Sequence, residues 1–276
     1  MLSSLPQHIA LTLLLFTHTT WLPAGDTALP VLDVPYATTK PSLEAKADDP
    51  AWKRAAVVPK LSLSLGTDKG SVAKPTEVRL LWDERFLYLR FTCEDDAIHL
   101  PETGRDAPLY RGDVVQVFID AKGDSRQVIE VLCNANNDVQ DLQILLTTEP
   151  RSDENLQLRS DVEERDYWIC QDWNASGLRT AAAKDEKAGR RTGWRVEMAI
   201  PAKALLRRLG ERALRPMTLR ANLVRYEWQP PPGPNQEWSL LSMNWAPVME
   251  GCPHLSPAAM GFLKLRPKLP DAKAQE

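Results

Sequence analysis

Residues 77–93 read Glu77-Val-Arg-Leu-Leu-Trp-Asp-Glu-Arg-Phe-Leu-Tyr-Leu-Arg-Phe-Thr-Cys93, and this stretch carries the clearest structural signal in the chain. Apolar and polar residues alternate up to Trp82 and again from Phe86 onward, which is the period of a β-strand with one buried face. The charged triplet at 83–85 interrupts the alternation and predicts a turn. The stretch therefore predicts a β-hairpin.

Further strands follow along the chain, together with one short helix. Apolar runs separated by turn residues predict strands at 114–120, 127–133, 139–145, 167–173, 178–183, 194–200, 219–226, 237–241 and 261–265. Pro201 in a first turn and Gly210 after a last turn predict a helix over 201–209. Residues 147–166 are polar and predict a long exposed loop. We expect an all-β fold: an antiparallel two-sheet β-sandwich, jelly-roll-like, with one short helix.

The ends of the chain differ from this strand-rich middle. Residues 1–24 are expected to be a signal peptide, because the short apolar run Ile9–Phe16 precedes the small residues Ala24 and Gly25. The expected location is therefore periplasmic or secreted. Residues 25–42 are rich in Pro, Thr and Ala and predict a linker or lead-in. The sandwich is expected over 43–266, and 267–276 are expected to be a flexible tail.

Charge and composition limit the class of partner. The 276 residues carry a formal net charge of −3, so no basic field attracts nucleic acid or an anionic membrane. We expect a monomer without a membrane span whose partner is small or neutral. The chain has nine tryptophans, whose flat faces suit sugar stacking and which also fill protein cores.

The four cysteines show no C-x-x-C spacing, which argues against a zinc or redox motif. An oxidising compartment would allow one or two disulfides among them. Cys93 and Cys133 each end a predicted strand and are the first pair to test; buried free thiols are the alternative. The other two cysteines are Cys170 and Cys252.

The segment Ala107-Pro-Leu-Tyr-Arg-Gly-Asp-Val-Val-Gln-Val-Phe-Ile-Asp120 resembles family 9 carbohydrate-binding modules. That family has an aromatic residue, then Asp, then a carboxylate or amide, then an apolar run ending in Asp. Tyr110, Asp113, Gln116 and Asp120 match this pattern. The resemblance covers about residues 43–266 and extends to the segments 48–52, 78–89, 194–201 and 253–265.

The resemblance implies a shallow cleft in which two aromatic rings hold the end of a sugar. Tyr110 takes the first aromatic position, and Trp245 or His254 takes the second. Gln116 and Glu130, with Asn134 beside them, fall where the family places groups that bond sugar hydroxyls. This sequence departs from the family pattern in three ways: Tyr replaces Trp, Gln replaces a carboxylate, and the second ring is that of a His. These departures put the family's reducing-end glucan specificity in doubt for this chain.

Each aromatic position also has a structural interpretation. Tyr110 is either a stacking ring or a strand-edge residue, Trp245 is either a stacking ring or core, and His254 is either a contact or a turn residue. The resemblance further implies structural Ca²⁺, for which Asp95 and Asp96 are the candidate ligands because calcium prefers oxygen donors. We expect no other cofactor.

The function expected from these residues is non-catalytic binding of a poly- or oligosaccharide that supports extracellular or periplasmic carbohydrate catabolism. Glycosidases need two facing carboxylates, and no spacing singles out such a pair. Any hydrolysis of glycosyl bonds would come from a partner enzyme, as for an accessory module of a xylanase-like system. A haem-binding redox domain on a related sandwich is the alternative, with ligands from Met198, Met217, Met243, Met249, Met260 or His254.

Overall fold

The computed structural model describes residues 28–65, 67, 71–146, 156–159, 167–187, 189–231, 233, 235–246, 248 and 257–269. The expected signal peptide, Cys252 and His254 lie outside these residues, as do residues 270–276 of the expected tail. Within the described part of the chain, no helix has the length and apolar character needed to cross a membrane.

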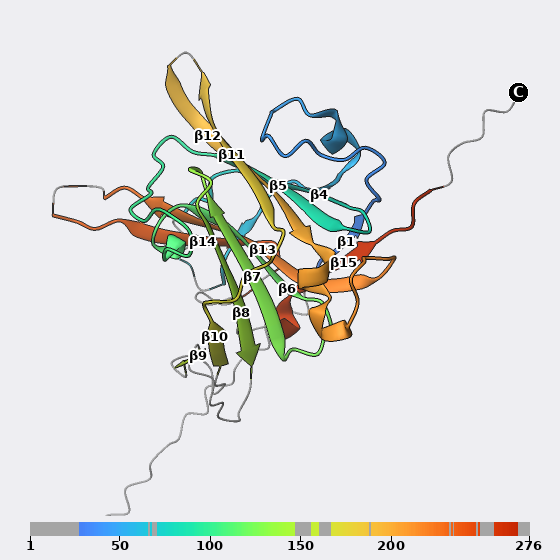
Figure 1. Cartoon of the computed structure of the whole chain (residues 1–276). Helices are drawn as coiled ribbons and strands as arrows, with labels where there is room; N and C mark the ends of the chain where they lie inside the picture. The colour runs from blue at the N-terminus through green and yellow to red at the C-terminus, as the bar shows by residue number, and fades with distance from the viewer. Residues whose placement is uncertain are drawn as a thin grey trace, which may run out of the picture.

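Two β-sheets pack against each other, which confirms the predicted sandwich (Figure 1). The five-stranded sheet has the order β11-β12-β5-β4-β2, and the ten-stranded sheet has the order β1-β15-β13-β6-β7-β8-β10-β9, with β14 and β3 paired beside β13. The first sheet contains β2 (Ala56–Val58), β4 (Thr76–Trp82), β5 (Phe86–Glu94), β11 (Arg179–Lys187) and β12 (Arg190–Pro201). The second contains β1 (Val31–Val34), β3 (Ser62–Leu63), β6 (Val114–Asp120), β7 (Gln127–Asn134), β8 (Val139–Leu146), β9 (Leu156–Arg159), β10 (Tyr167–Cys170), β13 (Thr218–Gln229), β14 (Ser239–Asn244) and β15 (Gly261–Leu265).

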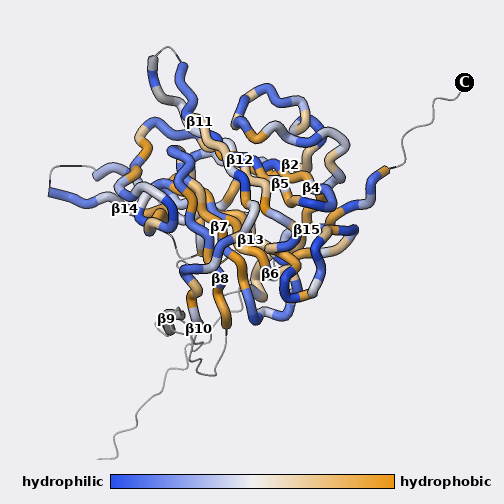
Figure 2. The backbone as a smooth tube through the Cα atoms, in the orientation of Figure 1, coloured by the Kyte–Doolittle hydropathy of each residue, from blue (hydrophilic) through white to orange (hydrophobic). Residues whose placement is uncertain are grey.

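The main core lies between the sheets, where alternate residues of facing strands interdigitate. The predicted hairpin is β4 and β5, paired from Thr76 with Cys93 to Trp82 with Leu87. Leu80, Leu89 and Phe91 of this hairpin have no exposed surface. The apolar strands therefore run through the middle of the molecule, with hydrophilic segments around them (Figure 2).

The lead-in is part of the folded unit, which begins ahead of the expected boundary at residue 43. β1 pairs in parallel with β15, whereas the other strand pairs of both sheets are antiparallel. Farther on, the backbone N–H of Ala37 donates to the carbonyl of Trp82 over 2.8 Å. Residues 31–37 thus connect β15 of the ten-stranded sheet with the end of β4 in the five-stranded sheet.

The segment after this lead-in covers the outer face of the five-stranded sheet. Ala37, Leu43 and Trp52 pack there against Leu81 and Tyr88. The indole N–H of Trp52 donates to Glu197 over 2.9 Å, and the backbone N–H of Ala45 donates to the other oxygen of that carboxylate over 3.1 Å. This sheet therefore has both of its faces covered.

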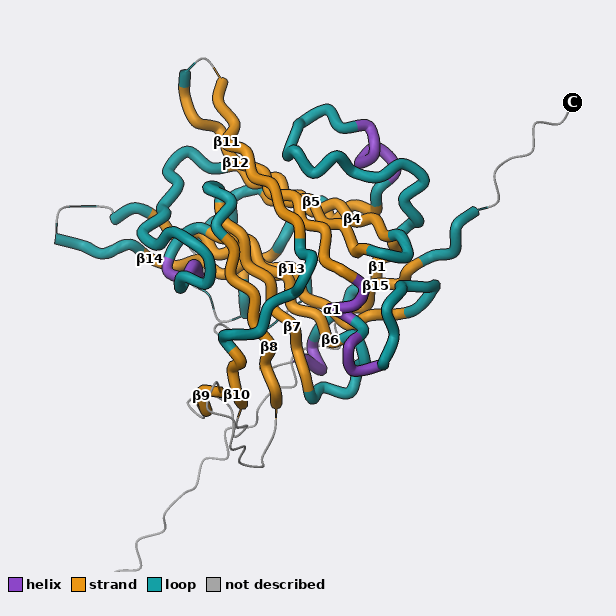
Figure 3. The backbone as a smooth tube through the Cα atoms, viewed as in Figure 1, coloured by secondary structure: helices purple, strands orange, loops and turns teal. Residues whose placement is uncertain are grey.

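The helical content is small, as predicted (Figure 3). The helix α1 spans Ala202–Leu205 and is followed by a 3-10 turn, η3, at Arg207–Leu209. Gly210 ends this turn at φ 69°, a left-handed conformation that glycine adopts without steric cost. Other 3-10 turns are η1 (Pro50–Arg54), η2 (Leu109–Arg111) and η5 (Pro257–Ala259).

Two expectations are corrected by the structure. The predicted loop 147–166 contains β9, whose Leu-Gln-Leu-Arg sequence has the two-residue period of a strand despite its charged surroundings. Cys93 and Cys133 are buried free thiols and do not form the disulfide considered first. They lie on different sheets, and the Cys133 sulfur is 3.7 Å from the carbonyl of Asn134, in the turn at the end of its own strand.

Candidate functional site

The candidate site lies on the outer face of the ten-stranded sheet. Val115, Val117 and Ile119 of β6 point into the core between the sheets. Because side chains alternate along a strand, Gln116 and Phe118 point to the opposite face. The same reasoning places Glu130 of β7 on this outer face, since Ile129 and Val131 belong to the main core.

Four buried polar side chains lie on this face, Gln116, Glu130, Gln140 and Asn244, which we call the outer-face cluster. Val224 of β13 lies between Asn244 and Gln116 in register. Leu132 of β7 lies opposite both Gln116 and Gln140. The cluster therefore extends over β14, β13, β6, β7 and β8, with apolar side chains between its polar groups.

The cluster is buried, yet several of its polar atoms have no partner. Gln116, Gln140 and Asn244 are 1%, 7% and 2% exposed. Within the described part of the chain, no hydrogen bond reaches Nε2 of Gln116, Oε1 of Gln140 or Oδ1 of Asn244. A buried polar atom without a partner costs about 1–3 kcal/mol, so three of them on one face indicate a place where a ligand or water completes the bonds.

Glu130 adds a carboxyl group that favours its neutral form. Burial alone raises the pKa of Glu130 to about 8. At neutral pH, the group therefore retains its proton and can both donate and accept a hydrogen bond. Together the cluster offers a donor from Gln116, acceptors from Gln140 and Asn244, and a group of both kinds, which matches hydroxyl groups that donate and accept at once.

Tyr110 lies at one end of the outer face, on the turn η2 before β6. Leu109 of this turn packs against Val114 and Leu132, which fixes η2 on the sheet. The Tyr110 side chain is 45% exposed, so its ring is open to solvent. The indole N–H of Trp228 donates to the Tyr110 carbonyl over 3.3 Å and connects η2 to β13.

A second group of rings lies beside Tyr110 that the sequence analysis did not assign to a site. His99 stacks on Trp238 with ring centroids 4.1 Å apart, and its ring is 6.1 Å from that of Trp228. All three rings are partly exposed. The sequence signal for them was the number of tryptophans, but residues 99, 228 and 238 lie too far apart in the chain to suggest a cluster.

Other predicted site residues do not join the cluster. Asn134 uses its side chain to build the turn after β7: its Oδ1 accepts N–H groups of Asn136 and Asp138 over 2.9 and 3.0 Å, and its Nδ2 donates to the Asp138 carboxylate. Trp245 packs against the main core, with its ring beside Gly261. His254 lies outside the described residues.

The methionines considered for haem ligation are mostly core residues. Met198 and Met243 are fully buried in the main core, and Met260 is fully buried in a separate apolar cluster on the outer face. Met217 packs at the edge of the main core. Met249 and His254 lie outside the described residues.

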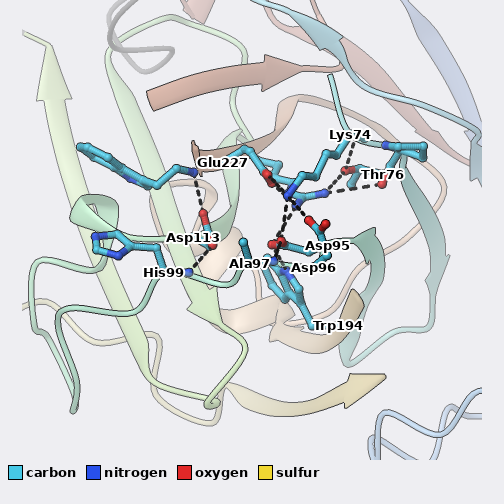
Figure 4. A network of polar contacts seen from close by, with 12 residues as sticks. Lys74, Thr76, Asp95, Asp96, Ala97, His99, Asp113, Trp194 and Glu227 are labelled. Atoms are coloured by element: carbon cyan, nitrogen blue, oxygen red, sulfur yellow. Dashed lines mark hydrogen bonds and ion pairs between the residues drawn. The ribbon is translucent and has the colours of Figure 1, made fainter. Parts of the chain in front are cut away.

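The predicted metal ligand Asp95 belongs to a buried ionic network between the sheets (Figure 4). Lys74 lies 3.0 Å from Asp95, 3.1 Å from Asp96 and 2.6 Å from Glu227. Arg225 has no exposed side-chain surface and pairs with Asp95 at 3.2 Å and also with Glu227. Carboxylate oxygens of Asp95, Asp113 and Glu227 lie within 4.8 Å of one another, and this convergence was not expected from the sequence.

These residues do not fit calcium well. Calcium requires six to eight oxygen ligands, whereas Asp95 already accepts from Lys74, Arg225, Trp194 and the backbone of Ala97. Lys74 and Arg225 supply the positive charge that a metal ion would bring. Asp96 is exposed over 81% of its side chain and bonds to Lys74. Asp95 is therefore neutralised and hydrogen-bonded by groups of the protein itself.

Asp113 connects this network to the rings beside Tyr110. Its carboxylate accepts the backbone N–H groups of His99 and Trp228, each over 2.6 Å. Burial raises the pKa of Asp113 to about 7, although these two N–H groups act in the opposite direction. Asp113 therefore fixes the backbone of both His99 and Trp228, which places it as a positioning residue rather than a ligand contact.

A family model described as carbohydrate family 9 binding domain-like matches residues 43–219, more than half of the chain. The chain belongs to this family. The resemblance drawn from residues 107–120 is thereby confirmed. No curated protein matches this family 9 chain in sequence.

Solved structures similar to this family 9 chain share its fold. One, from Bacteroides uniformis and described as a carbohydrate-binding protein, has a TM-score of 0.61 and 16% identity, over 87% of this chain and 100% of its own. A family 9 module from Caldicellulosiruptor kristjanssonii in complex with cellotriose has a TM-score of 0.56 and 15% identity, over 89% of this chain and 97% of its own. The family 9 module from the same organism in complex with glucose has a TM-score of 0.56 and 14% identity, over 88% of this chain and 100% of its own.

Proposed function

We propose that this protein binds a neutral oligo- or polysaccharide at the outer-face cluster. The observation that carries the proposal is the set of buried, unpartnered donor and acceptor atoms of Gln116, Gln140 and Asn244. Sugar hydroxyls can satisfy donors and acceptors together, and the neutral carboxyl of Glu130 has the same double capacity. The open ring of Tyr110 offers a flat face to a pyranose at the end of the same sheet face.

Membership of the family supports a binding role. The cellotriose and glucose in the Caldicellulosiruptor complexes are ligands of that module, and they make β-glucans the first candidates for this chain. A site with a few hydrogen bonds and one open ring is expected to bind in the micromolar range or more weakly.

We propose further that the protein binds its ligand without catalysing a reaction on it. A glycosidase needs two carboxyl groups across a cleft, about 5–10 Å apart. Glu130 is the carboxyl group of the outer-face cluster, whereas Glu197 lies on the other sheet, bonded to Trp52. We also propose that residues 1–24 direct export of the protein. Outside the cytoplasm it would support carbohydrate catabolism by a partner hydrolase.

The test is binding of Gln116→Ala on a glycan array, followed by calorimetry with the best ligand. Because the substitution removes the unpartnered donor, affinity should fall about tenfold or more. The side chain is buried, so its truncation also lowers the melting temperature, and circular dichroism at the assay temperature should show that the variant is folded. The matched control is Gln143→Ala on β8, which alternation places on the other face. Equal affinity of wild type and Gln116→Ala for every bound glycan would reject the cluster as the site.

A further inference from the structure

A second hollow, formed by other elements, has a different chemical character. It has a volume of about 540 Å³ and lies between the loop after β10 and the α1–η3 turn. Trp173, Asn174 and Ser176 form one side. The other side is mainly basic, with Lys203, Arg207, Glu211 and Arg212. We call it the basic hollow.

Its positive charges are not neutralised inside the protein. Within the described part of the chain, no ion pair reaches Lys203, Arg207 or Arg212. The acidic lining residue, Glu211, is already paired with Arg215 at 2.8 Å. Three unpaired cations at one concavity, in a chain whose net charge is −3, give a local field that attracts an anion.

The neighbouring residue Arg208 differs from these cations because its charge is already paired. Arg208 forms two hydrogen bonds with the Asp124 carboxylate, of 2.8 and 2.9 Å, outside the hollow. Arg207, one position earlier on the same turn, faces the hollow instead. A guanidinium offers a planar pair of donors that fits a carboxylate or sulfate group, which is the arrangement that Arg208 already makes with Asp124.

The opposite wall offers groups of another kind and is held in place by the backbone. Trp173 is 8% exposed and anchored in the main core, so its accessible part forms a fixed apolar surface. The backbone N–H of Ala175 donates to the buried carboxylate of Asp141 over 2.6 Å. Lys203 donates to the hydroxyl of Ser176 over 3.4 Å, which connects the two walls.

We propose that the basic hollow is a second binding site and that it takes an acidic saccharide. The apolar wall at Trp173 and the hydroxyl of Ser176 suit a sugar ring, and the unpaired cations suit a carboxylate carried by that ring. The outer-face cluster has no unpaired cation among its members and would leave such a carboxylate buried without a partner. The two sites therefore select different ligands, and the hollow does not depend on the proposed function of the cluster.

The test is calorimetry with a galacturonate trisaccharide, with cellotriose and inorganic sulfate as comparison ligands. The double variant Arg207→Gln/Arg212→Gln should lose about tenfold or more in affinity for the galacturonate, because it removes two charged hydrogen-bond donors. The control Arg208→Gln removes one arginine charge outside the hollow and should stay within about twofold of wild type. Thermal melting should show that both variants are folded.

A variant of the other site separates the two proposals. Gln116→Ala should bind the galacturonate as wild type does. The proposal is overturned if the double variant binds it with unchanged affinity, if Arg208→Gln loses as much as the double variant, or if Gln116→Ala alone abolishes binding. It is overturned equally if inorganic sulfate binds as tightly as the galacturonate, because the sugar ring would then contribute nothing.

Discussion

Gln116 and Glu130 are diagonal neighbours on β6 and β7, because Gln116 lies opposite Leu132 and Glu130 lies opposite Phe118. Diagonal neighbours in an antiparallel pair are about 7–8 Å apart, a distance that one sugar ring can bridge. Under the proposed function, the unpartnered amide of the first residue and the neutral carboxyl of the second would therefore contact the same sugar ring. The protonation state of Glu130 then bears on both stability and binding.

Stability should decrease as the pH rises from about 5 to about 8. The pKa of Glu130 rises from 4.5 to about 8 on folding, so the folded protein holds a proton that the unfolded chain releases. This contribution is complete below pH 4.5 and is lost as the pH passes 8; Asp113, whose pKa rises to about 7, acts in the same direction. Urea unfolding at several pH values should show that the free energy of unfolding depends less on pH for Glu130→Gln than for wild type.

The control for this comparison is Glu186→Gln, which changes an exposed carboxylate on β11 and should keep the wild-type pH profile. Parallel profiles for wild type and Glu130→Gln would contradict the assignment of a buried neutral carboxyl. Glu130→Gln keeps both a hydrogen-bond donor and a hydrogen-bond acceptor at this position, so we expect its glycan affinity at pH 7 to equal that of wild type. The wild-type affinity should decrease toward pH 9 as Glu130 loses its proton, whereas the affinity of Glu130→Gln should not.

Tyr110→Ala and Trp245→Ala should separate binding from stability. The Tyr110 ring is 45% exposed, so its removal should abolish glycan binding and move the melting temperature little. The Trp245 ring packs on the core beside Gly261, so its removal should cost about 3 kcal/mol or more of unfolding free energy. Thermal melting and calorimetry on both variants check this. A large loss of stability in Tyr110→Ala would mark that ring as structural.

Lys74→Met should destabilise the protein, whereas a chelator should not. Removing Lys74 leaves Asp95 and Glu227 with Arg225 as their remaining counter-ion, at a cost of about 1–3 kcal/mol, since Lys74 itself is 26% exposed. EDTA should leave the wild-type melting temperature unchanged, because Lys74 and Arg225 take the place of a metal ion in this network. Restoration of a lowered melting temperature by added Ca²⁺ would instead support calcium ligation by the wild-type protein.

The hairpin β4–β5 shows what a sequence can predict here. Its alternation and the Asp-Glu-Arg turn are local signals, and the observed pairing begins and ends within one residue of the expected strands. Gln116 and Glu130 were predicted to bond sugar hydroxyls from segments resembling the family, and the structure places both on the outer face. Their role in binding stays a prediction. The face of each strand follows from local sequence once the core residues are known.

The other members of the outer-face cluster could not be predicted without knowing the register between distant strands. Gln140 and Asn244 are about a hundred residues apart in sequence, and they share one sheet face only because β7, β6 and β13 join their strands into one sheet. Arg225 and Glu227 were not expected inside the protein, because charged residues in a strand usually face solvent. Their burial depends on Asp95 and Lys74, which the sequence places far away.

The parallel pairing of β1 with β15 also determines how the protein can be attached to something else. Val31 pairs with Phe262 and Val34 with Leu265, so the chain enters and leaves the sandwich along one border of the ten-stranded sheet. β6, β7 and β8 lie farther across that sheet. A tether or neighbouring module joined directly before β1 or directly after β15 would therefore attach at this border and not at β6, β7 or β8.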